Sequence, residues 1–297
     1  MPIKTLLQLV ALSALWGASF LFIRIASPVL GPTVLAGLRI SLAALTLACI
    51  MRALRQRWPW AHWRELLVIG ILSVALPFVL YAWAALHLPA GYSALLNTSA
   101  VVFGCLAGAW LKVDTLTPRK IIGCLLGFAG VALIVRLGPI TPTPAVVMAA
   151  LACTGAAMCY GFSNPLMKRA VGRIEPVAIA AGIHLWSAIL VAPAALWSLP
   201  QARFTVPAMV AVAVMGIITS ALAYWVHLRI LRHVSATAAM TPAFMIPLFG
   251  VAWGHLFLSE PVSSGMLAGA ALVLLATALV TEFNPFAKAQ DVATATP

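Results

Sequence analysis

The stretch LLVIGILSVALPF (residues 66–78) recurs 146 positions later as VAVMGIITSALAY (residues 212–224), and the match continues without a gap to residues 133 and 279. Small, turn-forming and acidic positions coincide along the whole alignment. The matched pairs are Gly70 with Gly216, Ala75 with Ala221, His87 with His233, Gly104 with Gly250, Gly108 with Gly254, Asp114 with Glu260 and Gly123 with Gly269. The sequence therefore contains two copies of one module.

The first helices of the two copies also match, with a slightly shorter offset of 144 residues that places Trp16-Gly17 on Tyr160-Gly161. We predict a first repeat at residues 1–138, a second at 139–284 and a flexible C-terminal tail at 285–297. Duplicated modules in apolar chains are typical of secondary transporters, whose binding site lies where the copies meet.

The composition predicts an all-α integral membrane protein. Hydrophobic residues make up 63% of the chain, charged residues only 8%, and the mean hydropathy is +1.07. Crossing a bilayer takes ~20 apolar residues as a helix, and such runs are too long and continuous for the strands of a membrane barrel. Ten transmembrane helices, five in each copy, are predicted near residues 5–24, 32–52, 65–85, 91–111, 118–136, 145–167, 174–198, 205–227, 235–258 and 262–283.

The basic residues predict the orientation of these helices. An odd number of crossings per copy makes the second copy enter the membrane from the opposite side, and Lys and Arg concentrate in cytoplasmic loops. With both termini cytoplasmic, the outer loops hold only Arg24, Arg136 and Arg203. The inner segments hold Lys4, Arg52, Arg55, Arg57, Arg64, Lys112, Arg119, Lys120, Lys168, Arg169, Arg173, Arg229, Arg232 and Lys288. We therefore predict inverted repeats, and the net charge of +12 is expected to meet lipid headgroups rather than nucleic acid.

The sequence contains no motif that predicts catalysis. It has no GxxxxGK[ST] loop, no HExxH and no GxSxG. We therefore expect no catalytic residues, no metal site, no cofactor and no enzyme activity.

The order of motifs in both copies resembles the drug/metabolite transporter superfamily in its EamA-type branch. The motifs are Trp16-Gly17 with its Tyr160-Gly161 counterpart, Gly104-xxx-Gly108 followed by Asp114, and Pro247 with Gly250-xxx-Gly254 followed by Glu260-Pro261. Within the superfamily the chain is similar to the YddG-type amino-acid exporters. Copy one departs from the pattern, with Val101 where copy two has Pro247.

The resemblance implies alternating access through a central cavity between the repeats, with outward transport, in a bacterial inner (plasma) membrane. The expected partners are a small-molecule substrate and the lipid bilayer, and the expected state is a monomer or weak homodimer. Two alternatives remain open: an exporter of lipophilic drugs or other metabolites with proton coupling, and a non-transporting scaffold or a channel. Saturable counterflow of solute would distinguish a carrier from a scaffold and from a channel.

Charged residues within the spans constrain the substrate. Only Arg39 lies well inside a span, and no carboxylate does. A transporter of anionic sugar phosphates needs buried cations in its binding site. A transporter that exchanges protons for cationic drugs needs a carboxylate in the middle of the membrane. A neutral or zwitterionic metabolite, such as an amino acid including the aromatic ones, fits better. We expect Arg39 itself to reach outward or to bond backbone carbonyls rather than substrate.

The candidate substrate-binding residues are polar or aromatic positions near mid-span on the helices that the resemblance places around the central cavity, which are the first, third and fourth of each copy. They are Trp16, Phe78, Tyr81, Asn97, Thr98, Ser99, Tyr160, Ser163, Asn164, Tyr224, His227, Thr241 and Trp253. Each has a structural alternative, because aromatic residues also gather at membrane interfaces and hydroxyls often bond a neighbouring helix.

Proline and glycine predict where helices bend. Proline within a span removes a ladder hydrogen bond, and the candidate gating residues are Pro77, Pro165, Pro242, Pro247 and Gly250. Pro242 and Pro247 fall on the ninth predicted span, which we expect to act as a bending gate.

Overall fold

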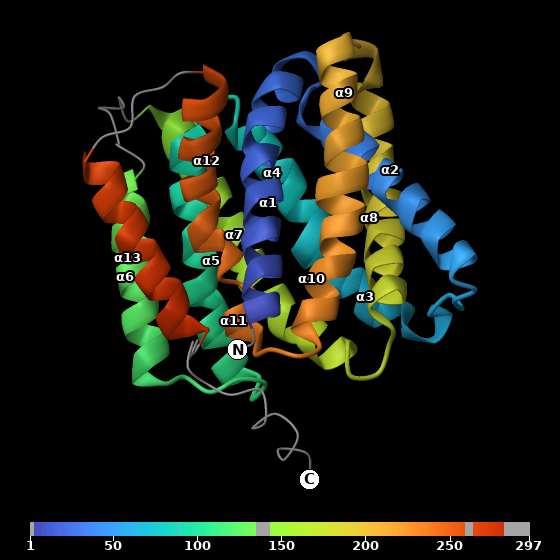
Figure 1. Ribbon diagram of the computed structural model, residues 1–297. Helices are drawn as coiled ribbons and strands as arrows, with labels where there is room; N and C mark the ends of the chain where they lie inside the picture. The colour runs from blue at the N-terminus through green and yellow to red at the C-terminus, as the bar shows by residue number, and fades with distance from the viewer. Residues whose placement is uncertain (1–2, 89, 135–142, 259–263, 282–297) are drawn as a thin grey trace.

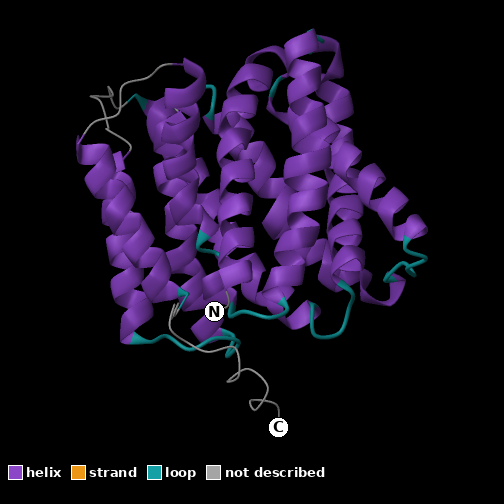
Figure 2. Ribbon diagram, in the orientation of Figure 1, coloured by secondary structure: helices purple, strands orange, loops and turns teal. Residues whose placement is uncertain are grey.

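The computed structural model describes residues 3–88, 90–134, 143–258 and 264–281, and every regular element among them is a helix (Figure 2). In chain order the elements are α1 (Ile3–Leu30), α2 (Pro32–Ala53), η1 (Trp60–His62), α3 (Trp63–Gly70), η2 (Ile71–Ala75), α4 (Leu76–Ala84), α5 (Ala90–Trp110), α6 (Pro118–Ile134), α7 (Pro144–Ala170), α8 (Pro176–Ser198), η3 (Leu199–Gln201), α9 (Val206–Val214), η4 (Met215–Leu222), α10 (Ala223–Leu231), α11 (Ala236–Ala239), α12 (Pro242–Leu258) and α13 (Ser264–Val280). The predicted all-helical fold is confirmed.

The helices group into the ten predicted segments. Seven segments of the described chain are long and apolar enough to cross a membrane. The remaining three contain α6, α12 and α13, each of 17 residues. The first segment is longer than predicted, because α1 continues to Leu30 past the charged Arg24. The predicted span gives only the part of the helix inside the hydrocarbon core, and α1 continues beyond it.

Helix starts follow from local sequence. Proline occupies the first turn of α2, α7, α8 and α9, where its missing N–H costs nothing. Thr143, Thr205 and Ser235 accept hydrogen bonds from backbone N–H groups of α7, α9 and α11. Gly31, with φ +78, forms the single-residue turn between α1 and α2, a conformation that disfavours residues with a Cβ.

The third segment of each copy contains a π-helical insert that the sequence did not predict. In copy one η2 lies between α3 and α4, and in copy two η4 lies between α9 and α10. Residues 71–75, moved by the repeat offset of 146, fall inside residues 215–222. π-turns are rare, so their recurrence at matched positions indicates a shared feature of the module.

The copies exchange partners across the molecule rather than packing as separate bundles. The second helices, α2 and α8, pack together at one edge, and the fifth helices, α6 and α13, pack at the other (Figure 1). Between them, α1 packs on α12, and α5 packs on α7. The first, third and fourth segments of both copies therefore meet at the centre.

The outer surface is apolar, as a membrane protein requires. Leu45, Leu125 and Leu196 are among many large hydrophobic side chains that are exposed. The described core is built largely of Ala, Val, Leu and Ile. The predicted repeat boundary at 138/139, the tail at 285–297, and Glu260 lie outside the described residues.

Candidate functional site

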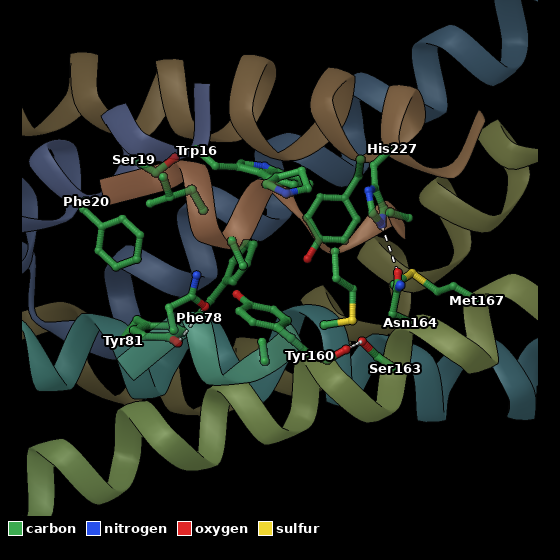
Figure 3. A pocket seen from close by; sticks show the side chains of 18 of the residues that line it. Trp16, Ser19, Phe20, Phe78, Tyr81, Tyr160, Ser163, Asn164, Met167 and His227 are labelled. Carbon is green, nitrogen blue, oxygen red and sulfur yellow. Dashed lines mark hydrogen bonds between the residues drawn. The ribbon is translucent and has the colours of Figure 1, made fainter. Parts of the chain in front are cut away.

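A cavity of about 130 Å³ lies at the centre, where the copies meet (Figure 3). Its walls come from α1, α2, α4, α5, α7, α10, α11 and α12, so both copies contribute. One water molecule needs about 10–15 Å³ measured in this way. The cavity therefore has room for roughly ten water-sized groups, comparable with a small metabolite.

Aromatic residues from matched positions face one another across the copies. Trp16 of copy one lies edge-on to His227 of copy two, with ring centroids 5.5 Å apart. Their repeat counterparts, Tyr160 of copy two and Tyr81 of copy one, stack with centroids 6.1 Å apart. Each copy thus places the aromatic residue of its first helix against the third segment of the other copy.

The π-helical inserts supply main-chain acceptors beside the cavity. Trp16 Nε1–H donates to the carbonyl of Thr219 at 2.9 Å. The Tyr224 hydroxyl donates to the carbonyl of Ser73. Because π-turns interrupt the normal helical ladder, such carbonyls accept bonds from neighbouring helices, and the two bonds fix both aromatic side chains.

Two amide side chains connect helices around the cavity. Asn97 Oδ1 accepts from the Tyr81 hydroxyl at 2.9 Å. Asn164 Oδ1 lies 3.1 Å from His227 Nε2, and Asn164 Nδ2 donates to the carbonyl of Ala236. His227 Nδ1 has no partner among the described residues. Asn164 therefore joins α7, α10 and the start of α11 at one point.

Arg39 lies on the cavity wall, which sequence reasoning did not anticipate. Its side chain is buried, and its guanidinium lies 3.8 Å from the centroid of the Phe78 ring. Nε donates to Ser220 Oγ at 2.8 Å, and Nη2 to Thr219 Oγ1 at 3.4 Å. Neither Asp nor Glu is among the residues that line the cavity. The site therefore has one cation among aromatic, amide and aliphatic side chains.

A smaller hollow lies beside the cavity, near the loop that joins α4 and α5. It shares Phe20, Ile23 and Tyr81 with the cavity and adds Arg24 and Leu88 to its lining. Arg24 is one of the cations that the sequence places at the outer side. The hollow therefore lies on the side of the cavity that faces the predicted outer end of the bundle.

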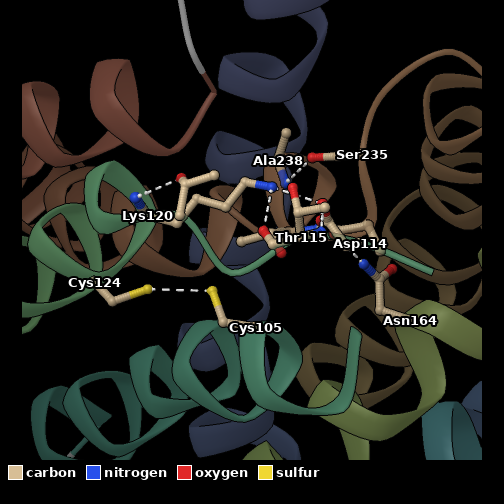
Figure 4. Close-up of polar contacts among 11 residues, drawn as sticks. Cys105, Asp114, Thr115, Lys120, Cys124, Asn164, Ser235 and Ala238 are labelled. Atoms are coloured by element: carbon tan, nitrogen blue, oxygen red, sulfur yellow. Dashed lines mark hydrogen bonds and ion pairs between the residues drawn. The ribbon is translucent and has the colours of Figure 1, made fainter. Parts of the chain in front are cut away.

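Polar contacts join the two copies at the opposite end of the described molecule. Asp114, in the turn between α5 and α6, accepts from Thr237 N at 3.0 Å and from Lys120 Nζ at 2.6 Å (Figure 4). Arg173 Nη2 donates to Glu65 Oε1 at 2.6 Å. Burial by itself would raise the pKa of the Asp114 carboxyl, but the bonds from Lys120 and Thr237 hold that pKa below its ordinary value.

The structure brings most of the predicted binding residues into one cavity. Nine of the thirteen line it: Trp16, Phe78, Tyr81, Asn97, Tyr160, Ser163, Asn164, Tyr224 and His227. Four do not. Thr98 and Ser99 donate to carbonyls of their own helix, Thr241 donates to Ala238 O, and Trp253 Nε1 donates to Ala14 O.

The proline positions have different surroundings from one another. Pro165 and Pro247 lie inside α7 and α12. Pro77 is the second residue after the π-helical insert, in the first turn of α4. Pro242 begins α12, after a break that separates it from α11, so the ninth segment is two helices rather than the one predicted. Gly250 belongs to α12, and the structure does not describe what it packs against.

Several cavity residues were not among the predicted binding residues. Ser19, Phe20, Met167 and Met240 line the cavity although each is an ordinary residue of an apolar span. The repeat offset of 144 would have found Phe20, which corresponds to Asn164. Among the described residues, no group of three or more His, Cys, Asp or Glu lies close enough to hold a metal.

Comparison with known proteins identifies the architecture. The model of the family described as "EamA-like transporter family" matches residues 3–136 and again residues 147–282. A solved crystal structure, 21% identical, superposes with a TM-score of 0.75 over 93% of this chain and 96% of its own. The second, separate match coincides with the repeat found in the sequence.

Curated relatives have similar length. The "Uncharacterized transporter YvbV" of Bacillus subtilis is 26% identical over 98% of this chain and 94% of its own. The "Probable terminal-alkyne amino-acid exporter" of Streptantibioticus cattleyicolor is 25% identical, covering 93% of each chain.

Proposed function

The chain belongs to the EamA-like transporter family, and from that premise we propose that it is a secondary transporter that exports small neutral or zwitterionic metabolites. Amino acids, including aromatic ones, are the proposed class. The observation that carries this proposal is the central cavity, which combines aromatic walls, two amides and one cation. No part of this site resembles a catalytic centre, so we propose transport without enzyme activity.

The size and chemistry of the cavity support an amino-acid-sized solute. About 130 Å³ accommodates on the order of ten non-hydrogen atoms. Trp16, Phe78 and Tyr160 offer ring faces and edges to an apolar side chain. Asn97 offers polar contacts to the amino and carboxylate end of an amino-acid solute. The name of the relative from Streptantibioticus cattleyicolor supports amino acids and the outward direction.

The proposed mechanism is alternating access. Segments from both copies surround the cavity, Arg24 lines a hollow beside it, and contacts such as Asp114 with Thr237 join the copies at the far end. We propose that these contacts close the far end and that it opens as the other end closes, with bending at Pro247 and Pro165. Matched helices in inverted copies allow the two ends to exchange roles.

The proposed location is a bacterial inner membrane with both termini in the cytoplasm. Lys and Arg, concentrated in alternate loops, support this orientation. The protein is proposed to act as a monomer or weak homodimer, with lipid and solute as its partners.

Counterflow in proteoliposomes tests the proposal. Vesicles loaded with unlabelled L-phenylalanine, L-leucine or L-threonine are diluted into trace labelled solute at equal pH on both sides. Saturable accumulation that depends on the internal solute supports a carrier for amino acids. Accumulation only under an imposed pH gradient supports the proton-coupled alternative, and non-saturable flux supports a channel.

A further inference from the structure

We propose that Arg39, held in place by Ser220 and Thr219, is the subsite that binds the carboxylate of the transported solute. This inference rests on the proposed function and adds to it the group that the protein recognises. The site joins the two copies, since Arg39 lies on α2 and both hydroxyls belong to η4.

The guanidinium is buried and lies against the cavity. Arg39 is only 6% exposed, yet it lines the central cavity together with Phe78 and Tyr160. A buried charge without a counter-ion carries a large desolvation cost. The Phe78 ring beneath the guanidinium offsets only part of that cost.

The carboxylates of the described chain are occupied elsewhere. Asp114 is paired with Lys120, Glu65 with Arg173, and Glu175 lies 3.4 Å from Arg232. None of the three lines the cavity. No described residue therefore neutralises Arg39.

The remaining donors of Arg39 are suited to a carboxylate. A guanidinium has five N–H donors, and the described residues accept from Nε and Nη2 only. Nη1 has no acceptor among the described residues, yet it is not among the fully buried polar atoms that lack a partner, so it has free space beside it. The unused donors thus remain for a planar oxygen pair, which arginine binds with two parallel bonds.

The rest of the cavity selects among anions. A phosphate ester carries nearly two charges and is usually held by several cations, whereas the lining contains one. The aromatic side chains of Trp16, Phe20 and Tyr81 favour an apolar body attached to the anionic head. These features together indicate an amphipathic monocarboxylate, and an amino acid meets that description.

The alternative is that Arg39 has only a structural role, satisfied by two hydroxyls and one ring. The two roles differ in what happens when the carboxylate of the solute is removed. A carboxylate subsite discriminates strongly against the amide, while a structural arginine does not.

Competition against the wild-type protein distinguishes these roles without any substitution. Counterflow of labelled L-phenylalanine is inhibited by L-phenylalanine, L-phenylalaninamide, phenylethylamine and 3-phenylpropanoate in turn. We expect the amide and the amine to compete at least tenfold more weakly than the two carboxylates. Equal competition by L-phenylalanine and its amide would overturn the assignment.

Variants connect this preference to the residue. Arg39→Gln should reduce the tenfold preference for carboxylate over amide to near parity, and Arg39→Lys should retain part of it. Ser220→Ala should weaken the preference several-fold, because Nε loses its acceptor. Arg203→Gln is the matched control, since the described bond of Arg203 is made by its backbone N–H. An Arg39→Gln protein that exchanges solute with full carboxylate preference contradicts the inference.

A binding measurement separates failure of the subsite from failure of the proposed function. Thermal unfolding of the purified wild-type protein is followed with 3-phenylpropanoate or with neutral 3-phenylpropanamide. A rise in Tm with the carboxylate alone supports the subsite even when no amino acid is exchanged, a result that would reject only the proposed function. No difference between the two compounds, in both binding and competition, rejects the subsite.

Discussion

Ser73 and Thr219 occupy the same position in the two copies, 146 residues apart, and the main-chain carbonyl of each accepts a hydrogen bond from an aromatic side chain at the cavity. Both residues lie in the π-helical inserts of the third segments. The donors differ, because Trp16 comes from α1 and Tyr224 from α10. The module therefore repeats the acceptor but not the donor.

Trp16→Phe is expected to lower stability and weaken solute exchange. It keeps an aromatic ring but removes the Nε1–H that donates to Thr219. A lost hydrogen bond of this kind costs about 1 kcal/mol, and the freed ring no longer holds its orientation against His227. Thermal unfolding in detergent and counterflow measure the two effects.

Tyr224→Phe is the matched comparison, since it removes the hydroxyl that donates to Ser73. Both variants should lose a similar amount of stability. A Trp16→Phe protein as stable and active as wild type would show that the Thr219 carbonyl does not need this donor.

Asn164→Leu should be more damaging than either. Asn164 is buried, donates to Ala236 O and lies 3.1 Å from His227 Nε2. Leucine has a similar volume but leaves both partners buried without a bond, each at a cost of about 1–3 kcal/mol. We expect loss of exchange and a clearly lowered Tm. Ser163→Ala is the control on the same helix, because Ser163 Oγ bonds only its own turn; equal effects of the two changes would contradict the argument.

Gly161→Ala and Gly155→Ala should have opposite effects, although both lie on α7. A Cβ at Gly161 would lie 2.4 Å from Phe103 Cβ and 2.9 Å from Gly104 N, where α7 crosses α5. A Cβ at Gly155 would meet nothing within 4 Å. Alanine at Gly161 must separate the helices and destabilise the protein, whereas alanine at Gly155 should stabilise it by up to about 1 kcal/mol. Comparison of Tm for the two variants tests the close crossing, and equal values would refute it.

The helices and their duplication follow from sequence because both depend on patterns along the chain. Apolar runs between charges predicted ten segments, and a constant offset predicted the repeat. The π-helical inserts could not be predicted, because in a mostly apolar run such as residues 215–222 two adjacent hydroxyl residues do not report the helical period. The break before Pro242 was missed because this proline was interpreted as a bend within one span rather than as the first turn of a new helix.

The cavity could be predicted only in part. Aromatic and amide residues near mid-span are conspicuous, and Trp16, Tyr81 and Asn164 do line it. Arg39 was expected to avoid substrate, since a cation two turns from a helix end can reach the interface. The direction in which the Arg39 side chain points depends on its hydrogen bond to Ser220, 181 positions away. No local sequence pattern reveals such a contact. Thr98 and Ser99 are the converse case: they were predicted as cavity residues but do not line the cavity, and their short hydroxyl side chains donate to carbonyls of their own helix.

Pro247→Ala is expected to stabilise the protein while slowing exchange. Pro247 lies inside α12, where it removes one ladder hydrogen bond and permits bending. Alanine restores the bond and stiffens the helix. Pro193→Ala in α8 is the control, since α8 packs at the edge of the molecule against α2. Faster or unchanged exchange by Pro247→Ala, together with unchanged Pro193→Ala, would exclude α12 as a bending gate.

Asp114→Asn is expected to destabilise the closed end of the protein at neutral pH but not in acid. The Asp114 carboxylate accepts from Lys120 and Thr237, and its pKa is held below the ordinary value, since these bonds outweigh the effect of burial. A depressed pKa contributes stability that is fully present above the unfolded pKa of about 3.9 and is lost as the pH falls through the lower folded value. At pH 7 the loss on substitution should be about 1–3 kcal/mol, measured as a lower Tm, and the gap to wild type should close below about pH 4. Glu175→Gln is the control, because that side chain is 57% exposed and its 3.4 Å pair with Arg232 is screened by solvent. A Tm difference between Asp114→Asn and wild type that persists unchanged into acid would mean that the carboxylate charge is not what holds Thr237.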